Sequence, residues 1–193
     1  MAIQLIMIRH GESAGNAGLP TADHRNIPLT GLGREQAQKL AETWTKSPDF
    51  IYVSPFLRAR ETTQPTIDRF PDVKIRIDDD LREFTYLSPA TCVNTTKEER
   101  RPRVNAYWDR LDPEYVDGEG AESFSALAAR TRHFLQEMRS LPDGSTVFAF
   151  SHMLCITGIR MWIDHPDLDL RERMRIFRTY PLIRNTECLT FRL

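Results

Sequence analysis

Short apolar runs alternate along the chain with longer helical patterns, and this alternation limits the possible folds more than any other feature. Five runs have the length and the β-branched or aromatic content of strands: residues 3–8, 50–53, 73–77, 146–150 and 188–193. Strands that alternate with helices form a mainly parallel sheet covered on both faces. The sequence therefore predicts an α/β fold, a three-layer sandwich with a mainly parallel central sheet.

The helical patterns lie between these runs. The first follows Thr30, a residue type that caps helices. Its expected buried stripe consists of Leu32, Gln36, Leu40 and Trp44, with Ala37 and Ala41 beside it. A second helix begins near residue 56, and Pro65 is expected to end or kink it. Further helices are predicted over residues 98–111, 123–138 and 153–163.

The length of 193 residues suits one domain, and at that size a core forms without disulfide or metal staples. We therefore expect residues 1–193 to form a single domain. Residues 84–120 are mostly irregular, apart from the helix predicted within them. Long irregular stretches in compact domains are often functional, so this segment is predicted to be a lid or specificity insertion.

Charge and composition argue against several classes of binding partner. The formal net charge is -1, whereas a nucleic-acid-binding domain usually has a strong basic excess. No apolar stretch is long enough to span a membrane, and the N-terminal apolar run is too short for a signal peptide. The three cysteines are widely spaced and match no metal-ligand pattern. We expect a cytoplasmic protein with reduced thiols and no metal or other cofactor.

Charged and nucleophilic residues follow four of the predicted strands. Arg9-His10 follows the first strand, Arg58 comes shortly after the second, Glu83 after the third, and His152 after the fourth. In open α/β sheets, ligands bind at the carboxyl ends of the strands. The sequence therefore predicts that these side chains meet at one edge of the sheet.

These residue types suit phosphoryl transfer. The planar guanidinium of arginine keeps its charge and makes paired hydrogen bonds to phosphate oxygens. A neutral imidazole can attack phosphorus and form a covalent intermediate, and a carboxylic acid can protonate the leaving oxygen. Because the sequence has no visible metal-ligand cluster, the positive charge would come from arginine and protonated histidine.

Six short stretches carry a resemblance to a known family, and they occur in the family's order over nearly the whole chain. They are RHGESAGN at 9–16, LTGLGREQA at 29–37, SPFLRARET at 54–62, LRE at 81–83, GAES at 120–123 and FSH at 150–152. The first resembles the RHG(E)(S/T)xxN signature of the histidine phosphatase superfamily, the phosphoglycerate mutase-like proteins. The chain is similar to the phosphatase branch of that superfamily.

The resemblance implies a phosphoglycerate mutase-like fold and a role for each motif residue. His10 would be the phosphorylated nucleophile, and Glu83 would give a proton to the leaving group. The residues that would hold the phosphoryl group are Arg9, Arg58, His152, Asn16 and Ser13. Met153 stands where the family often has glycine after the second histidine, so we expect it to affect substrate choice. Gly15 stands where many mutases have tryptophan, and the acid loop continues as Phe84-Thr85-Tyr86-Leu87 without the usual glycine.

Other interpretations stay open for some of these residues. Glu83 follows the acidic residues 78–80, so a solvated run of charge is its alternative. Arg100 and Arg101 either hold a second anionic group of the substrate, as a basic pair does in mutase-like relatives, or lie on a solvated helix face. The histidines outside any motif are read as surface residues or as residues behind the site; these are His24, His133 and His165.

The predicted function is metal-independent hydrolysis of a small-molecule phosphomonoester through a phosphohistidine on His10. The alternatives are phosphoglycerate mutase-type transfer, a non-catalytic phosphate-binding role and phosphate acceptance from a phosphoprotein. The short chain, the missing tryptophan and the modest lid favour hydrolysis over mutase activity. The mostly polar helix faces fit either a monomer or a dimer.

Overall fold

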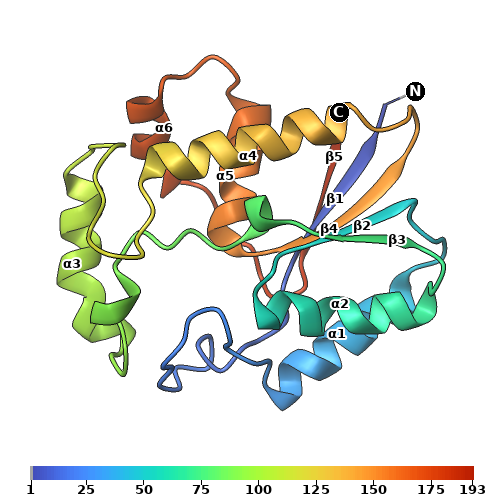
Figure 1. Cartoon of the computed structure of the whole chain (residues 1–193), viewed down its shortest axis with the longest axis horizontal. Coiled ribbons are helices and arrows are strands. Elements are labelled where there is room, and N and C mark those ends of the chain that lie inside the picture. The colour runs from blue at the N-terminus through green and yellow to red at the C-terminus, as the bar shows by residue number, and fades with distance from the viewer. Residues whose placement is uncertain (1) are drawn as a thin grey trace.

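A five-stranded sheet forms the middle of the molecule (Figure 1). The computed structural model describes residues 2–193. The strands are β1 (Gln4–Arg9), β2 (Phe50–Val53), β3 (Lys74–Ile77), β4 (Thr146–Ser151) and β5 (Cys188–Arg192). Their order is β3-β2-β4-β1-β5; β1 to β4 run parallel, and β5 pairs antiparallel with β1. The prediction of a mainly parallel sheet is confirmed.

Helices cover both faces of the sheet. They are α1 (Gly31–Thr43), α2 (Leu57–Arg69), α3 (Lys97–Asp109), α4 (Phe124–Arg139), α5 (Met153–Asp164) and α6 (Leu170–Phe177). Figure 1 shows α1 and α2 on one face and α4 and α5 on the other, with α3 standing to one side. This is the predicted three-layer sandwich.

Two apolar clusters fill the spaces between these layers. In β4, Val147 and Ala149 pack in the cluster with α4 and α5, whereas Phe148 and Phe150 pack in the cluster with α2. Successive residues of a strand point to opposite faces, so a strand covered on both sides is apolar throughout. The four residues are at most 3% exposed, which accounts for the uninterrupted apolar run in the sequence.

The predicted buried stripe of α1 is wrong at its first residue. Leu32 is 51% exposed, and the fully buried residues of α1 are Gly33, Ala37 and Ala41. The reason is close packing, because a Cβ atom at Gly33 would lie 2.0 Å from the carbonyl oxygen of Glu12. Small residues, rather than large apolar ones, let α1 pack onto the loop that follows β1.

Pro65 does not end the second helix, because α2 continues to Arg69. Proline has no N–H group, so the helix loses one hydrogen bond at this point. Thr62, Thr63 and Thr66, on the other side of the helix, are fully buried. Their packing against the protein interior keeps the segment helical beyond the proline.

The segment 84–120 is more ordered than its composition indicates. It holds the short helix η2 (Pro89–Thr91) and α3, and its aromatic side chains join a cluster with α4 and α6. The Trp108 ring stacks on Phe177 with centroids 5.4 Å apart. The segment is therefore a packed wall beside α4 and α6. The sequence patterns above predict neither α6 nor the short helix η1 (Asp79–Leu81).

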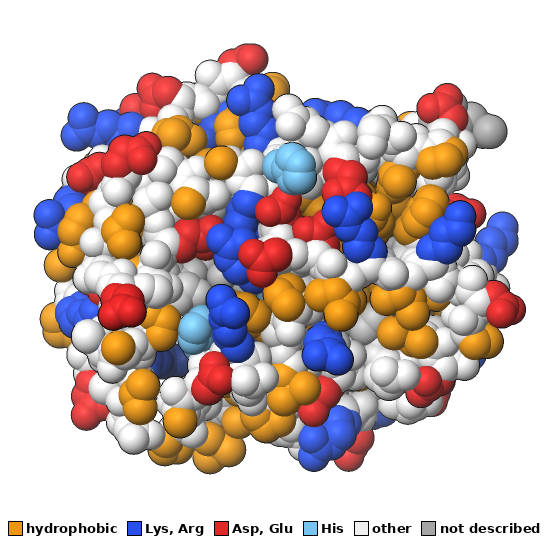
Figure 2. Space-filling model, in the orientation of Figure 1, with side chains coloured by type: hydrophobic (Ala, Val, Ile, Leu, Met, Phe, Trp, Pro, Cys, Tyr) orange, Lys and Arg blue, Asp and Glu red, His pale blue; other side chains and the backbone are white. Residues whose placement is uncertain are grey.

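Charged side chains of both signs are interspersed over the face shown in Figure 2, in keeping with the near-zero net charge. Within residues 2–193, no helix has the length and apolarity needed to cross a membrane.

Candidate active site

The parallel register places the two motif histidines side by side. Arg9 of β1 pairs with Ser151 of β4, so the residues that follow them, His10 and His152, leave neighbouring strands at the same edge. Their ring centroids lie 5.1 Å apart. The next strand, β2, ends at Val53 opposite Phe150 and brings the second motif to this edge.

His10 is held as one neutral tautomer. Arg58 Nε donates to His10 Nε2 at 3.1 Å, and a guanidinium has no acceptor, so Nε2 must carry the lone pair. His10 Nδ1 lies 2.7 Å from the Gly11 carbonyl oxygen and therefore carries the proton. Burial, and then the charge of Arg58, lower the pKa of His10 to about 3. The ring is thus uncharged at neutral pH, with Nε2 as its nucleophilic atom.

Two arginines bring fixed positive charge to this ring. Arg58 also donates from Nη1 to the His24 carbonyl at 2.8 Å, and its guanidinium lies 5.1 Å from the centre of the Phe56 ring. Burial lowers the pKa of Arg58 to about 10, so it stays charged at neutral pH. Arg9 donates from Nη1 to the Ile183 carbonyl, and its buried Nε has no hydrogen-bond partner among residues 2–193.

His152 is fully buried, with a hydrogen-bond partner at one of its two ring nitrogens. Ser54 Oγ lies 2.7 Å from His152 Nε2 and also accepts from the Phe56 backbone N–H at 3.3 Å. The other ring nitrogen, Nδ1, is buried and has no partner within the described part of the chain. Burial lowers the pKa of His152 well below its ordinary value. His152 is 0% exposed, and it is absent from the lining of the cavity over His10.

The loop after β1 presents an amide donor. Asn16 Oδ1 accepts from Ser13 Oγ and from Asn185 Nδ2, both at 3.2 Å, which leaves the Asn16 Nδ2 group free to donate. Asn185 also donates to the His10 carbonyl at 2.8 Å and lines the same cavity. Sequence reasoning missed Asn185, because it lies in the loop before β5 and belongs to no motif.

The Glu83 carboxylate lies against the first turn of α5 and is not part of a solvated run of charge. Its Oε1 accepts from the backbone N–H groups of Phe84 at 2.8 Å and Cys155 at 3.1 Å, and its Oε2 accepts from Leu154 at 3.4 Å. Burial raises the pKa of Glu83, while these N–H groups and the charge of Arg58 act in the opposite direction. The net direction is upward, which suits a group that must deliver a proton.

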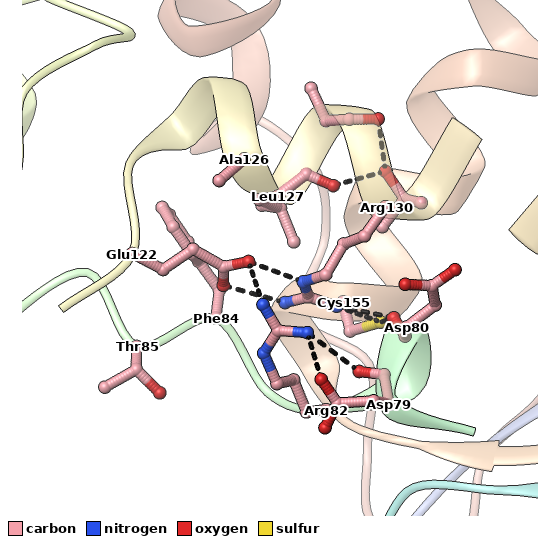
Figure 3. A network of polar contacts seen from close by, with 12 residues as sticks. Asp79, Asp80, Arg82, Phe84, Thr85, Glu122, Ala126, Leu127, Arg130 and Cys155 are labelled. Carbon is pink, nitrogen blue, oxygen red and sulfur yellow. Dashed lines mark hydrogen bonds and ion pairs between the residues drawn. The ribbon is translucent and has the colours of Figure 1, made fainter. Parts of the chain in front are cut away.

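An ion-pair network fixes the loop that carries Glu83 (Figure 3). Glu122 Oε1 accepts from Arg130 Nε at 2.6 Å and from Arg82 Nη2 at 2.9 Å. Arg130 also donates to the Asp80 carbonyl at 2.5 Å. Since Asp80 and Arg82 come just before Glu83 in the chain, the buried pair Glu122–Arg130 ties the acid loop to α4.

A cavity of about 640 Å³ opens over these groups. Its lining includes the predicted residues Arg9, His10, Ser13, Asn16, Arg58 and Glu83, and the predicted specificity residues Arg100 and Met153. Arg101 does not take part, because it is 68% exposed and pairs with Glu98 at 3.3 Å on the outer side of α3. Lys97 lines the cavity instead. A second hollow of about 600 Å³, near the start of β2, holds none of the predicted residues. Among residues 2–193, no three His, Cys, Asp or Glu side chains gather as metal ligands do.

Comparisons with known proteins identify the family. The model of the histidine phosphatase superfamily (branch 1) matches residues 5–182, so the chain belongs to this superfamily. A phosphoglycerate mutase-like protein 4 from Arabidopsis thaliana is 28% identical over 152 residues, which are 77% of this chain and 66% of that protein. That match thus spans slightly less than two thirds of the relative. The probable phosphoglycerate mutase GpmB of Escherichia coli is 29% identical over 174 residues, 84% of this chain and 78% of that protein.

Solved structures share the fold. A mycobacterial glucosyl-3-phosphoglycerate phosphatase has a TM-score of 0.77 at 23% identity, covering 98% of this chain and 90% of that one. A phosphoserine phosphatase mutant from Entamoeba histolytica has a TM-score of 0.75 at 23% identity, with the same coverage. Both are similar to this chain in architecture.

Proposed function

We propose that the protein hydrolyses phosphomonoesters without a metal ion, through a phosphohistidine on His10. The observation that carries this proposal is the state of His10, a buried neutral ring with its Nε2 lone pair held at 3.1 Å by Arg58. Such a ring is a nucleophile at neutral pH, and the charges around it suit an anionic substrate.

Two displacements complete the reaction. In the first, the Arg58 Nε–H group leaves His10 Nε2 for a phosphoryl oxygen, and the released lone pair of Nε2 bonds to phosphorus. The bond from phosphorus to the ester oxygen breaks, and Glu83 gives that oxygen a proton. In the second, water attacks phosphorus, the P–N bond breaks, and the Glu83 carboxylate takes the proton from water. The products are the alcohol and inorganic phosphate, and both His10 and Glu83 return to their starting states.

The remaining polar groups stabilise the charge on the transferring phosphoryl group. Arg9 and Arg58 supply fixed positive charge, and the free N–H groups of Asn16 Nδ2 add a neutral donor, whereas contact of His152 with the phosphoryl group stays a prediction. Ser13 acts through Asn16, because its hydroxyl is bonded to Asn16 Oδ1. The complete set of donors favours a catalytic over a merely phosphate-binding role.

Mutase activity is the second candidate, because the curated relatives named above include a probable phosphoglycerate mutase. A mutase must keep water away from the phosphohistidine. Here the cavity opens to solvent past Leu182, which is 78% exposed, and this favours transfer to water. The small-molecule partner, the cytoplasmic location and the choice between monomer and dimer stay predictions.

The test is phosphate release from a panel of phosphomonoesters in EDTA, with interconversion of phosphoglycerates measured in parallel. We expect release that is lost in His10→Ala and kept in His165→Ala, a matched change at an exposed histidine. Interconversion without release would establish the mutase. Full activity in His10→Ala would refute the phosphohistidine.

A further inference from the structure

The side of the cavity that receives the leaving group is apolar. If Glu83 protonates the ester oxygen, as the proposed function requires, the first carbon atoms of the alcohol lie beside the neighbours of Glu83. These neighbours are Phe84, whose backbone N–H donates to Glu83 Oε1, and Leu154, whose backbone N–H donates to Oε2; both residues line the cavity. Met153, where many family members have glycine, lines the cavity next to them.

Apolar side chains form much of the cavity lining, beside polar ones such as Thr85, Lys97 and Arg100. We define the apolar slot as the cavity wall formed by Phe84, Tyr86, Leu87, Met153, Leu154 and Leu182. The slot is backed by packed rings, because the Tyr86 ring lies 5.0 Å from Tyr107 and 5.5 Å from Trp108. A wall held in this way keeps its shape when a ligand enters, so little ordering free energy opposes binding.

The mouth of the slot exposes an apolar side chain to water. Leu182 is 78% exposed and yet lines the cavity. A ligand group that covers this side chain would remove apolar surface from water, which is favourable. The volume of about 640 Å³ lies in the range of pockets that enclose drug-sized ligands, far more than a three-carbon phosphate ester fills.

Charge further restricts the organic group. Among the described residues that line the cavity, Glu83 is the only acid, and Lys97 and Arg100 are basic residues on its outer side. An ammonium group in the slot would have no carboxylate partner, since Glu83 is engaged with backbone N–H groups.

We propose that the preferred substrates are phosphomonoesters with a bulky apolar organic group, aromatic or long-chain alkyl, that lies in the apolar slot and carries no positive charge. The inference rests on the proposed function for its orientation, because Glu83 is taken to face the leaving oxygen. It predicts a gain in affinity with each methylene group that the slot buries.

The binding test uses alkylphosphonates, whose P–C bond His10 does not cleave. Hexylphosphonate and ethylphosphonate differ by methylene groups alone, and each buried methylene is worth about fourfold in affinity. We expect hexylphosphonate to bind at least about 15-fold tighter in calorimetry, with at least two methylenes buried. A ratio below about fourfold, less than one buried methylene, would overturn the slot. 6-Aminohexylphosphonate should lose most of the gain.

Matched variants locate the effect. Leu182→Ser should lower the hexyl-to-ethyl affinity ratio, whereas Leu32→Ser, the same change at an exposed leucine of α1 outside the cavity, should leave the ratio unchanged. An unchanged ratio in Leu182→Ser would place the alkyl chain elsewhere and overturn the slot. Release of phosphate from hexyl phosphate tests the proposed function separately. An enzyme that binds hexylphosphonate tightly but releases no phosphate would refute hydrolysis and leave the slot standing.

Discussion

Replacing Glu122 by leucine should destabilise the protein strongly, because the change leaves a buried charge without its partner. Arg130 is 6% exposed, and two of its nitrogens donate to the Glu122 carboxylate at 2.6 and 3.0 Å. After the change its remaining hydrogen bonds go to the Asp80 carbonyl and the Cys155 sulfur, both uncharged acceptors. Breaking a buried pair in this way costs about 3–5 kcal/mol.

That cost is large on the scale of a whole domain, whose free energy of unfolding is about 5–15 kcal/mol. In a chain of this length, 1 kcal/mol shifts Tm by about 2–4 °C, so Glu122→Leu should lower Tm by about 6–20 °C. Urea unfolding followed by tryptophan fluorescence gives the free energy directly.

The matched control is Glu98→Leu, the same change in an ion pair whose two side chains are 74% and 68% exposed. Exposed pairs contribute at most about 1 kcal/mol, so its Tm should fall by less than about 4 °C. Adding Arg130→Met to Glu122→Leu removes the unpaired charge and should recover part of the loss. A loss in Glu122→Leu no larger than in the control, or a double variant less stable than Glu122→Leu, would refute the reasoning.

Three further predictions concern the site. Glu83→Gln should slow alkyl phosphates by about 10²–10⁴ and p-nitrophenyl phosphate much less, because only the alkoxide needs a proton to leave; equal losses in kcat would contradict this role. Asn185→Ala, which frees Asn16 Oδ1 and the His10 carbonyl, should lower kcat/KM by about tenfold at nearly constant Tm, and unchanged kinetics would show that Asn185 positions neither group. The pKa of His10 is about 3 in the folded protein and 6.5 ordinarily, so the unfolded chain binds more protons between these values. Wild type should therefore lose stability relative to His10→Gln as pH falls through this window. A difference in the free energy of unfolding by urea that does not change with pH would disprove the low pKa.

The sequence predicted the candidate site best where its residues directly follow predicted strands. His10 and His152 follow neighbouring parallel strands at once, so strand assignment alone brings them together. Asn185 could not be found in this way, because its role comes from contacts with residues about 170 positions earlier in the chain, Asn16 and His10. Periodicity likewise reports which residues are apolar and not how closely elements approach, which is why it favoured Leu32 over Gly33.

The orientation of helix α3 relative to the cavity could not be predicted from the sequence either. Its sequence is rich in charge, and a choice among its basic residues depends on which side of the helix faces the cavity. The buried residues Tyr107 and Trp108 set that orientation through rings on other elements. They place Lys97 and Arg100 at the cavity and Arg101 in solvent. The sequence identified the basic segment but had no means to orient it.

In the proposed reaction, His10 and Glu83 need opposite protonation states, and the structure favours each state in a different way. His10 is kept unprotonated at Nε2, because burial and a donating arginine both disfavour the imidazolium. Glu83 is subject to opposing effects, since burial favours the neutral acid whereas the first N–H groups of α5 favour the carboxylate. Oε1 receives two short N–H bonds and Oε2 only one of 3.4 Å, so Oε2 is the oxygen that can carry the proton. An acid stabilised in both forms can give its proton to the leaving alcohol and take one from water, and the second displacement requires this of it.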